Sequence, residues 1–361
     1  MSLIAFLTPA VMYLAIFVLS LWLPAQRVEG YITDPETGAP QIYYLNGLRV
    51  LLAMVSIGAL LVWGGWFSWS WLYLFRWELL AGAFVLGIVY TLYLVLPAQP
   101  TGKPFLADLF LGRTLNHAHF GRVDVKMYLY VVGAVVLFLN TWSAVHFHVN
   151  LYPWGHNPGV VLHAILISFF VLDYLFFERV HLWTYDIFAE RLGFKLAWGC
   201  FVFYPFFYFI GLWSTADLPT PDVIHSLGWV WLVGCTLVFF CGWMLARGAN
   251  MQKYTFKRDP QANFMGIAPV TIGQGDRQVL ASGFWGQSRH INYLGEVLMA
   301  LGIAASLGHV DVIWPWLYPL YYVILLGTRE RDDDARCEEK YGEVWRAYKK
   351  AVPYRIIPRL Y

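Results

Sequence analysis

The sequence predicts an all-α, polytopic integral membrane protein with nine or ten transmembrane helices and a cytoplasmic, amphipathic C-terminal segment. Of its 361 residues, 59% are hydrophobic and only 13% are charged, about half the charged share of a soluble domain. The charges are also unevenly spaced, so that long stretches contain no Lys, Arg, Asp or Glu. These observations exclude a soluble enzyme, and a net charge of +2 argues against a nucleic-acid partner.

Nine spans are predicted, because charged side chains are costly at the bilayer centre. The uncharged stretches are 1–26, 50–75, 79–102, 127–172, 196–216, 223–246, 297–310 and 312–328. The stretch 127–172 is long enough for two helices, and the turn-forming residues from Asn150 to Gly159 would separate them. The eighth span must begin near Ile291, which carries Glu296 into the membrane as a functional candidate. A tenth, partly inserted segment is considered for 262–288.

Lys and Arg are concentrated in alternate connections, which predicts the orientation. They cluster in 98–126, 178–195 and 247–290 and from Arg329 onward, whereas the intervening loops carry none. Because basic loops favour the cytoplasmic side, the N-terminus is expected outside and the C-terminus in the cytoplasm. We therefore divide one integrated membrane domain into N-terminal helices, 1–246, and C-terminal helices with cytoplasmic loops and tail, 247–361.

The segment that follows the seventh span mixes basic, amide and aromatic side chains. A membrane anchor would need only the basic residues. Asn250, Lys253, Phe256 and Arg258 together suit a bound dinucleotide phosphate, since cations bind phosphates, amides bind hydroxyls and an aromatic face binds a base.

A second segment, from Gly283 to Glu296, runs from a loop into the eighth helix. It contains Trp285 and Arg289, and a helix start beside Gly and Arg favours an anion. On a helix, Asn292 shares one face with Arg289 and with Glu296. His290 on its own is more typical of a structural role.

The last 33 residues carry 16 of the chain's 48 charges, a density that would also suit an amphipathic helix at the membrane surface. Their order is more specific than that, and together with the two segments above it resembles the membrane sterol reductase family. This family includes delta-14 sterol reductases, 7-dehydrocholesterol reductase, sterol delta-24(28) reductases and the sterol reductase domain of lamin B receptor. The matching positions are Asn250, Gln252, Lys253, Phe256, Arg289, His290, Asn292, Tyr293, Gly295, Glu296, Arg329, Asp333, Cys337, Lys340, Tyr341, Gly342, Trp345 and Tyr348.

The sequence departs from the family's pattern at six positions. The family has His where this chain has Thr328, Arg where it has Asp332, Pro and Arg where it has His117 and Ala118, Arg where it has Lys257 (with Arg258 adjacent), and Asp where it has Cys200. The last departure loses a carboxylate within the sixth span and bears more on the substrate position than on the cofactor.

The resemblance implies that NADPH transfers a hydride to a sterol double bond, with delta-14 as the first choice and delta-7 and delta-24(28) still open. An isolated alkene must first be protonated, so a general acid in a water-poor intramembrane pocket is expected. The implied acids are Tyr208, Asp333 and Glu296, and Asp173, Glu178 and Tyr208 are expected to line the sterol pocket. The implied NADPH-binding residues are Asn250, Lys253, Phe256, Arg258, Trp285, Arg289, His290, Asn292, Arg329, Asp333 and Tyr341.

Three alternatives were weighed. A membrane methyltransferase of the isoprenylcysteine type, which uses S-adenosylmethionine, shares the pattern around Tyr341 and Val352, but it lacks the Asn250–Arg258 segment and about five of the spans. A non-catalytic, reductase-like sterol-binding protein would fit the departures at Thr328 and Cys200. A metal hydroxylase is disfavoured, and no metal is expected, because the His pairs 117/119 and 146/148 would point apart on a helix. The membrane is either a bacterial inner membrane or the endoplasmic reticulum, and no oligomeric state is predicted.

Overall fold

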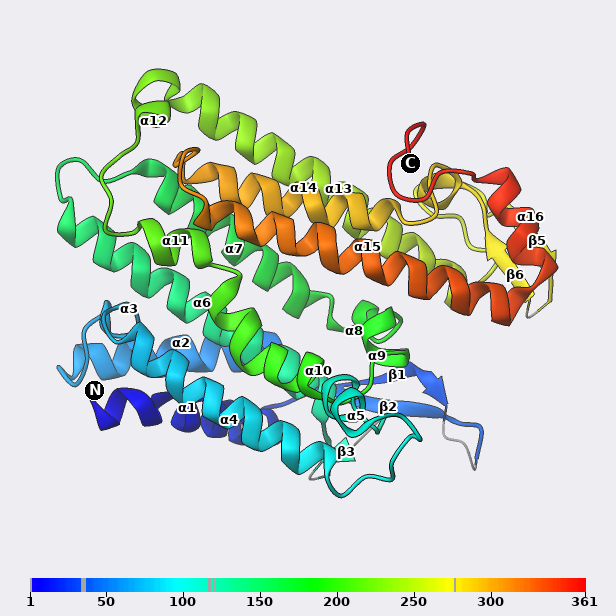
Figure 1. Cartoon of the computed structure of the whole chain (residues 1–361), viewed down its shortest axis with the longest axis horizontal. Coiled ribbons are helices and arrows are strands. Elements are labelled where there is room, and N and C mark those ends of the chain that lie inside the picture. The colour runs from blue at the N-terminus through cyan, green and yellow to red at the C-terminus, as the bar shows by residue number, and fades with distance from the viewer. Residues whose placement is uncertain (1, 34–36, 116–117, 120, 276) are drawn as a thin grey trace. The chain divides into compact units, whose positions relative to one another are not determined.

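The fold is that of a computed structural model that describes residues 2–33, 37–115, 118–119, 121–275 and 277–361. It is mostly helical (Figure 1) and divides into two compact units, Met1–Thr220 and Pro221–Tyr361. The expected division at residues 246 and 247 marks where the candidate cofactor loops begin, and it remains a prediction.

The first unit contains the helices that correspond to the first six predicted spans. Its elements are α1 (Leu3–Trp22), β1 (Gln26–Thr33), β2 (Pro40–Leu45), α2 (Gly47–Trp63), α3 (Trp71–Leu74), α4 (Arg76–Val95), α5 (Phe105–Leu111), β3 (Ala118–His119), β4 (Val123–Asp124), α6 (Val125–Leu151), α7 (Pro158–Phe176), α8 (Glu178–His181), α9 (Tyr185–Phe188), α10 (Phe194–Trp198), the π-helix η1 (Gly199–Phe207) and α11 (Ile210–Thr215). Helix α6 is the core of this unit and packs against η1, α7 and α3.

The predicted break between the fourth and fifth spans is confirmed, because α6 ends at Leu151 and α7 begins at Pro158. The side chain of Asn157 caps α7 by accepting a hydrogen bond from Gly159 N at 2.8 Å. Pro158 occupies the first helical position, where its missing N–H costs nothing.

The sixth predicted span is not a regular α-helix. Residues Gly199–Phe207 form a π-helix that contains Pro205, a widened turn of the kind often found at functional sites. Asn140 on α6 donates to the carbonyl of Pro205 at 3.0 Å, and Gly133 on α6 leaves room for the ring of Tyr204. Tyr208 follows directly at the end of this widened turn.

The second unit consists of three packed helices, α13 (Trp229–Arg258), α14 (Ile291–Ser306) and α15 (Trp314–Tyr341), and a smaller part formed by the antiparallel strands β5 (Thr271–Gln274) and β6 (Arg277–Leu280) and by α16 (Glu343–Ala351). It also contains α12 (Asp222–Leu227) and the 3-10 helix η2 (Gly283–Gly286). Helix α14 packs against both α13 and α15, and the three run side by side (Figure 1). The strands pack against α16, whose inner face is formed by Trp345, Tyr348 and Val352.

Glycines bring α13 and α14 unusually close together. A Cβ atom added at Gly295 would lie 2.4 Å from Ala246 N and 2.5 Å from Gly242 O. Small residues allow such backbone contact between helices in membranes. This contact fixes the register between the ends of α13 and α14, where the predicted cofactor residues lie.

The predicted spans coincide with helices throughout the described chain. Among the described residues, five helices are long and apolar enough to cross a membrane: α1, α4, α6, α7 and α13. Three shorter apolar helices, at 47–63, 194–207 and 291–306, and the first half of α15 account for the other four predicted spans. Helix α14 begins at Ile291 as predicted. In place of the tenth, partly inserted segment, the described part of 262–288 forms the β5–β6 hairpin and η2.

Candidate functional site

The candidate site lies in the second unit, where the end of α13 meets η2 and the start of α14. The Nζ of Lys253 lies 5.3 Å from the ring centre of Trp285, a cation–π distance. The indole N–H of Trp285 donates to Ala249 O at 2.9 Å. Asn292 donates to the side-chain oxygen of Asn250 at 3.4 Å. We call the five residues Asn250, Lys253, Trp285, His290 and Asn292 the cofactor cluster.

Gln252 holds η2 against α13, and it is absent from the predicted site residues. Its side chain, 3% exposed, accepts from Phe284 N at 3.0 Å and donates to Ser282 O at 3.2 Å. Gly283 between them has a positive φ of 61°, which favours glycine. The match of Gln252 to the family motif is the sequence signal that could have identified it. By holding η2, Gln252 positions Trp285.

His290 is buried and neutral at the start of α14. Burial, and then the positive charges of Lys253, Arg289 and Arg355, lower the pKa of His290 to about 3. Its ring stacks on Tyr293 with a centre-to-centre distance of 4.9 Å. Its Nε2 has no hydrogen-bond partner among the described residues, and neither has Oδ1 of Asn292. A buried polar atom normally requires a partner, so these two atoms mark a place for a polar ligand.

Helix α15 turns a polar stripe toward the cofactor cluster. Arg329, Asp333, Cys337 and Tyr341 follow at intervals of four and therefore share one face of α15. Burial and the carboxylate of Asp333 raise the pKa of the Cys337 thiol to about 12, whereas the ammonium of Lys253 lowers it. The charges of Lys253 and Asp333 therefore both act on this thiol, together with those of Asp334 and Lys340.

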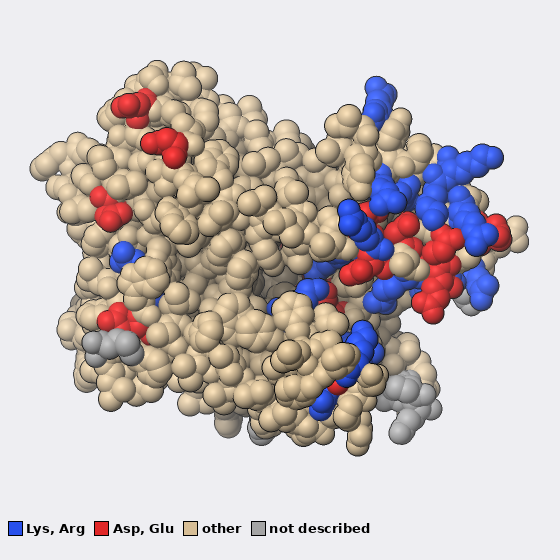
Figure 2. Space-filling view, in the orientation of Figure 1, with Lys and Arg blue, Asp and Glu red and all other residues tan. Residues whose placement is uncertain are grey.

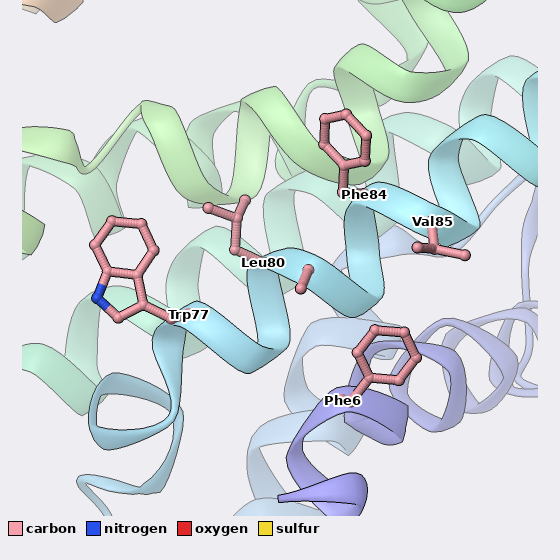
Figure 3. A pocket seen from close by; sticks show the side chains of 6 residues that line it. Phe6, Trp77, Leu80, Phe84 and Val85 are labelled. Carbon is pink, nitrogen blue, oxygen red and sulfur yellow. The ribbon is translucent and has the colours of Figure 1, made fainter. Parts of the chain in front are cut away.

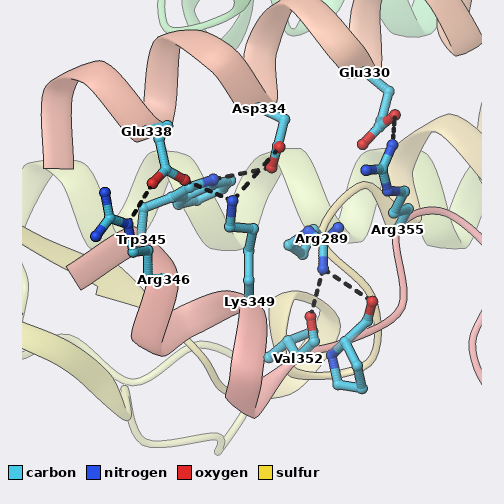
Figure 4. Close-up of polar contacts among 10 residues, drawn as sticks. Arg289, Glu330, Asp334, Glu338, Trp345, Arg346, Lys349, Val352 and Arg355 are labelled. Atoms are coloured by element: carbon cyan, nitrogen blue, oxygen red, sulfur yellow. Dashed lines mark hydrogen bonds and ion pairs between the residues drawn. The ribbon is translucent and has the colours of Figure 1, made fainter. Parts of the chain in front are cut away.

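The next face of α15 holds α16 through polar contacts (Figure 4), and Cys337 and Tyr341 of the stripe also pack against Trp345 and Tyr348 of α16. Asp334 accepts from the indole N–H of Trp345 at 2.9 Å, and Glu338 pairs with Lys349 at 2.6 Å and with Arg346 at 2.7 Å. The hydrogen bond from Lys349, followed by that from Arg346, lowers the pKa of the Glu338 carboxyl. These acidic residues are therefore structural, and they leave Asp333 as the carboxylate of the stripe.

Four predicted site residues of this unit are not members of the cofactor cluster. Arg289 is 4% exposed and donates to backbone carbonyls of the C-terminal tail. Phe256 is 5% exposed and packed in the core. Arg258 is exposed and donates to the hydroxyl of Tyr254 at 3.0 Å. Glu296 is half-buried on α14, one turn beyond Asn292.

The three remaining predicted residues belong to the first unit. Tyr208 is half-buried, with its ring centre 4.7 Å from that of Tyr204, and Asp173 is half-buried near the end of α7. Glu178 is 5% exposed and accepts from Gly47 N at 3.0 Å, which caps α2. Burial raises the pKa of Glu178 to about 7, against the lowering effect of that hydrogen bond.

A shallow apolar groove of about 410 Å³ is present in the first unit (Figure 3). Trp77, Leu80, Ala81, Phe84 and Val85 of α4 line it together with Phe6 of α1. None of the predicted catalytic or substrate residues lines this groove. Its largely apolar lining, in which the Trp77 indole nitrogen is the one polar side-chain atom, is suited to lipid acyl chains and offers no acid.

The predicted histidine pairs can be described only in part, because His117 lies outside the described residues. His148 binds Ala216 O through Nδ1 at 2.8 Å and accepts from Asn157 N through Nε2 at 2.9 Å. The Nδ1 of His146 lies 2.8 Å from the hydroxyl of Ser70. The described rings of the 146/148 pair therefore contribute to packing within the first unit.

Comparison with known proteins agrees with the motifs. The model of the ergosterol biosynthesis ERG4/ERG24 family matches residues 4–361. The chain is 32% identical to a Delta(14)-sterol reductase of Arabidopsis thaliana over 354 residues, 94% of this chain and 91% of the relative. It is 31% identical to a Delta(14)-sterol reductase of Methylotuvimicrobium alcaliphilum over 370 residues, covering 98% and 82% of the two chains. A Delta(14)-sterol reductase of Ascobolus immersus is 29% identical over 380 residues, covering 100% and 86%.

These matches include the N-terminal spans that the isoprenylcysteine-type methyltransferases lack, so they favour the reductase family over that alternative. The apolar helices make the chain an integral membrane protein. The chain belongs to the ergosterol biosynthesis ERG4/ERG24 family.

Proposed function

We propose that this protein reduces a carbon–carbon double bond of a sterol with NADPH, and that the delta-14 double bond is the one it prefers. The relatives named Delta(14)-sterol reductase support the reaction class. The observation that carries the cofactor assignment is the cofactor cluster, in which a cation over an indole face lies beside two buried atoms without partners.

The residues of the cluster fit NADPH chemically. The Lys253 ammonium would neutralise a phosphate, the Trp285 ring offers an aromatic face, and the Asn250–Asn292 pair would bind hydroxyl or amide groups. Arg329 and Tyr341, on the polar stripe of α15, would add a further cation and a hydroxyl. When bound, NADPH supplies a hydride.

An acid of the chain must protonate the alkene, because an isolated double bond accepts hydride poorly. Asp333 is the candidate of the polar stripe, and Tyr208 and Glu296 are the candidates within the membrane. A tyrosine or carboxyl that keeps its proton in a water-poor pocket can donate it to the alkene carbon. We place the sterol against Tyr208 and Asp173. Glu178 is retained as a lining residue, although its carboxylate already caps α2.

The proposed orientation has the C-terminus in the cytoplasm, of either a bacterial inner membrane or the endoplasmic reticulum. In the second unit, Figure 2 shows charged side chains gathered over the end with α16, β5 and β6, and few over the end with α12. An NADPH site at the charged end would meet the cytoplasmic cofactor pool.

The test uses the purified full chain in nanodiscs with a delta-8,14-diene sterol and NADPH deuterated at C4 of the nicotinamide. We expect one deuterium from the cofactor in the sterol product, and in heavy water a second deuterium from solvent, by mass spectrometry. Loss of the cofactor's deuterium from the product would exclude hydride transfer. Parallel assays with delta-7 and delta-24(28) sterols identify the preferred bond.

A matched pair of variants tests the cofactor residues. Arg329→Gln removes a cation of the polar stripe, whereas Arg331→Gln removes an exposed one two residues further along α15. We expect kcat/KM for NADPH to fall at least about 10-fold for the first and to stay unchanged for the second. Equal rates would overturn the assignment. Binding of S-adenosylmethionine without NADPH would favour the methyltransferase, and NADPH or sterol binding without turnover would favour the non-catalytic protein.

A further inference from the structure

The C-terminal tail lies along the loop that leads into α14. Three consecutive residues of that loop donate hydrogen bonds to tail carbonyls: Ser288 Oγ to Ile356 O at 2.8 Å, Arg289 N to Tyr354 O at 3.0 Å, and His290 N to Arg355 O at 2.8 Å. The two segments are therefore zipped together over successive residues, although more than 60 positions separate them in the sequence.

The side chain of Arg289 strengthens this zipper. Its Nη1 donates to Val352 O and to Pro353 O, both at 2.9 Å, and the residue is 4% exposed (Figure 4). Hydrogen bonds from a buried guanidinium to carbonyls are stronger than neutral ones. Nη1 of the guanidinium thus binds the tail, whereas Nε is buried without a hydrogen-bond partner among the described residues.

Two further contacts hold the tail and the cluster together. Arg355 pairs with Glu330 of α15 at 3.1 Å, and that carboxylate is 1% exposed. On α16, the helix that precedes the tail, the hydroxyl of Tyr348 donates to Trp285 O at 2.8 Å. Residues that contact the tail and α16 are therefore next to, or identical with, members of the cofactor cluster.

We propose that residues 352–361 form a strap that holds His290 in its cofactor-binding position, with Tyr348 of α16 supporting Trp285 beside it, and that Arg289 is the positioning residue that locks the strap. The inference rests on the proposed function for the identity of the cofactor. It changes the role of Arg289 from a phosphate ligand, as its motif predicted, to a clamp on backbone carbonyls.

Hydrogen exchange on the full chain without NADPH tests the strap independently of activity. The amides of residues 289 and 290 donate to the strap, so they should exchange slowly in the wild-type protein. We expect Arg289→Gln to accelerate exchange there about 10-fold or more. Arg289→Lys should retain most of the protection because an ammonium can still donate to both carbonyls, and the control Lys350→Gln, at an exposed position outside the strap, should change nothing. Unchanged exchange in Arg289→Gln would overturn the clamp.

The effect on the site is measured by NADPH binding calorimetry and by steady-state kinetics. For Arg289→Gln we expect the Kd and KM for NADPH to rise about 10-fold together, with kcat within about threefold. A truncation after Tyr354 should also raise the Kd and the KM for NADPH. It removes the carbonyls of Arg355 and Ile356, which bind His290 N and Ser288 Oγ, but keeps the carbonyls that the Arg289 side chain binds.

If Arg289 were a phosphate ligand, Arg289→Gln would weaken NADPH binding, but the exchange of the free protein and the affinity of the truncated chain would stay normal. That result would overturn the proposal. If the truncated chain does not fold, Arg355→Gln replaces it: this variant removes the pair with Glu330 and the contact with the Tyr361 ring while the chain keeps its full length. Loss of exchange protection in a protein that never reduces a sterol would support the strap while refuting the proposed function.

Discussion

Replacing Gly295 by Ala should separate α13 from α14 and weaken the cofactor cluster. The added Cβ would lie 2.4 Å from Ala246 N and 2.5 Å from Gly242 O, and ordinary contact begins at 3.4 Å. Because both atoms belong to the backbone of α13, no side chain can move aside, and the helices must part by about 1 Å. Overpacking of this kind costs about 1–3 kcal/mol.

The same displacement reaches the site one turn away. The Asn250–Asn292 hydrogen bond is already 3.4 Å long, so a further shift would break it. Loss of one such bond weakens binding by about 0.5–1.5 kcal/mol, or about 2- to 10-fold in the KM for NADPH. Both the melting temperature and the cofactor affinity should therefore fall.

The assay follows thermal unfolding in detergent by tryptophan fluorescence, together with NADPH kinetics. We expect Gly295→Ala to lower the Tm by about 2 °C or more for each kcal/mol. The matched control is Gly234→Ala, also on α13, where an added Cβ meets nothing within 4 Å, and helix propensity should leave it neutral or slightly stabilised. Identical Tm and KM in the two variants would refute the close-contact argument.

Three further predictions concern single charges. Lys253→Gln should raise the KM for NADPH about 10-fold, whereas Lys350→Gln, on the exposed face of α16, should not; equal values would exclude a phosphate at Lys253. Burial lowers the pKa of His290 in the folded protein to about 3. Between pH 6.5 and that value, the imidazole therefore takes up a proton only in the unfolded chain. The free energy of unfolding should fall by about 1.4 kcal/mol between neutral pH and about pH 5.5. His290→Gln should flatten the Tm-against-pH curve, and an unchanged curve would contradict the buried neutral ring. Glu178→Ala should remove the acceptor for Gly47 N and cost about 1–2 kcal/mol, while Glu178→Gln should keep both the Tm and the sterol KM; a changed sterol KM with a normal Tm would make Glu178 a substrate residue.

Charge spacing predicted the helices well because the bilayer penalises charge along the whole of each span. The break after Leu151 and the start of α14 at Ile291 both follow from where charged and turn-forming residues occur. The π-helix could not be predicted in this way. Its widened turn is matched by two residues of a different helix: Asn140 donates a hydrogen bond to the Pro205 carbonyl, and Gly133 leaves room for the Tyr204 ring.

The motifs predicted which residues gather at the site, but not the direction in which each side chain points. Within the cofactor cluster, Lys253 contacts the ring of Trp285 and Asn292 contacts Asn250, as their residue types suggest. Arg289 turns to the carbonyls of Val352 and Pro353. Backbone carbonyls carry no sequence signal, so a residue that binds them is indistinguishable in a motif from one that binds a phosphate.

The structure also bears on whether the departures from the family pattern would prevent catalysis. Thr328 and Asp332 are both exposed on α15, and the hydroxyl of Thr328 is satisfied by the carbonyls of Ile324 and Leu325. The polar stripe with Asp333 occupies a different face of that helix, so neither change removes a group that faces Lys253. Of the described departures, only Cys200, buried in the π-helix, lies where a lost carboxylate could alter chemistry. It lies two turns before Tyr208, on the helix proposed to meet the sterol. A difference in this chain's catalysis should therefore appear in its choice or binding of sterol, while its affinity for NADPH stays typical of the family.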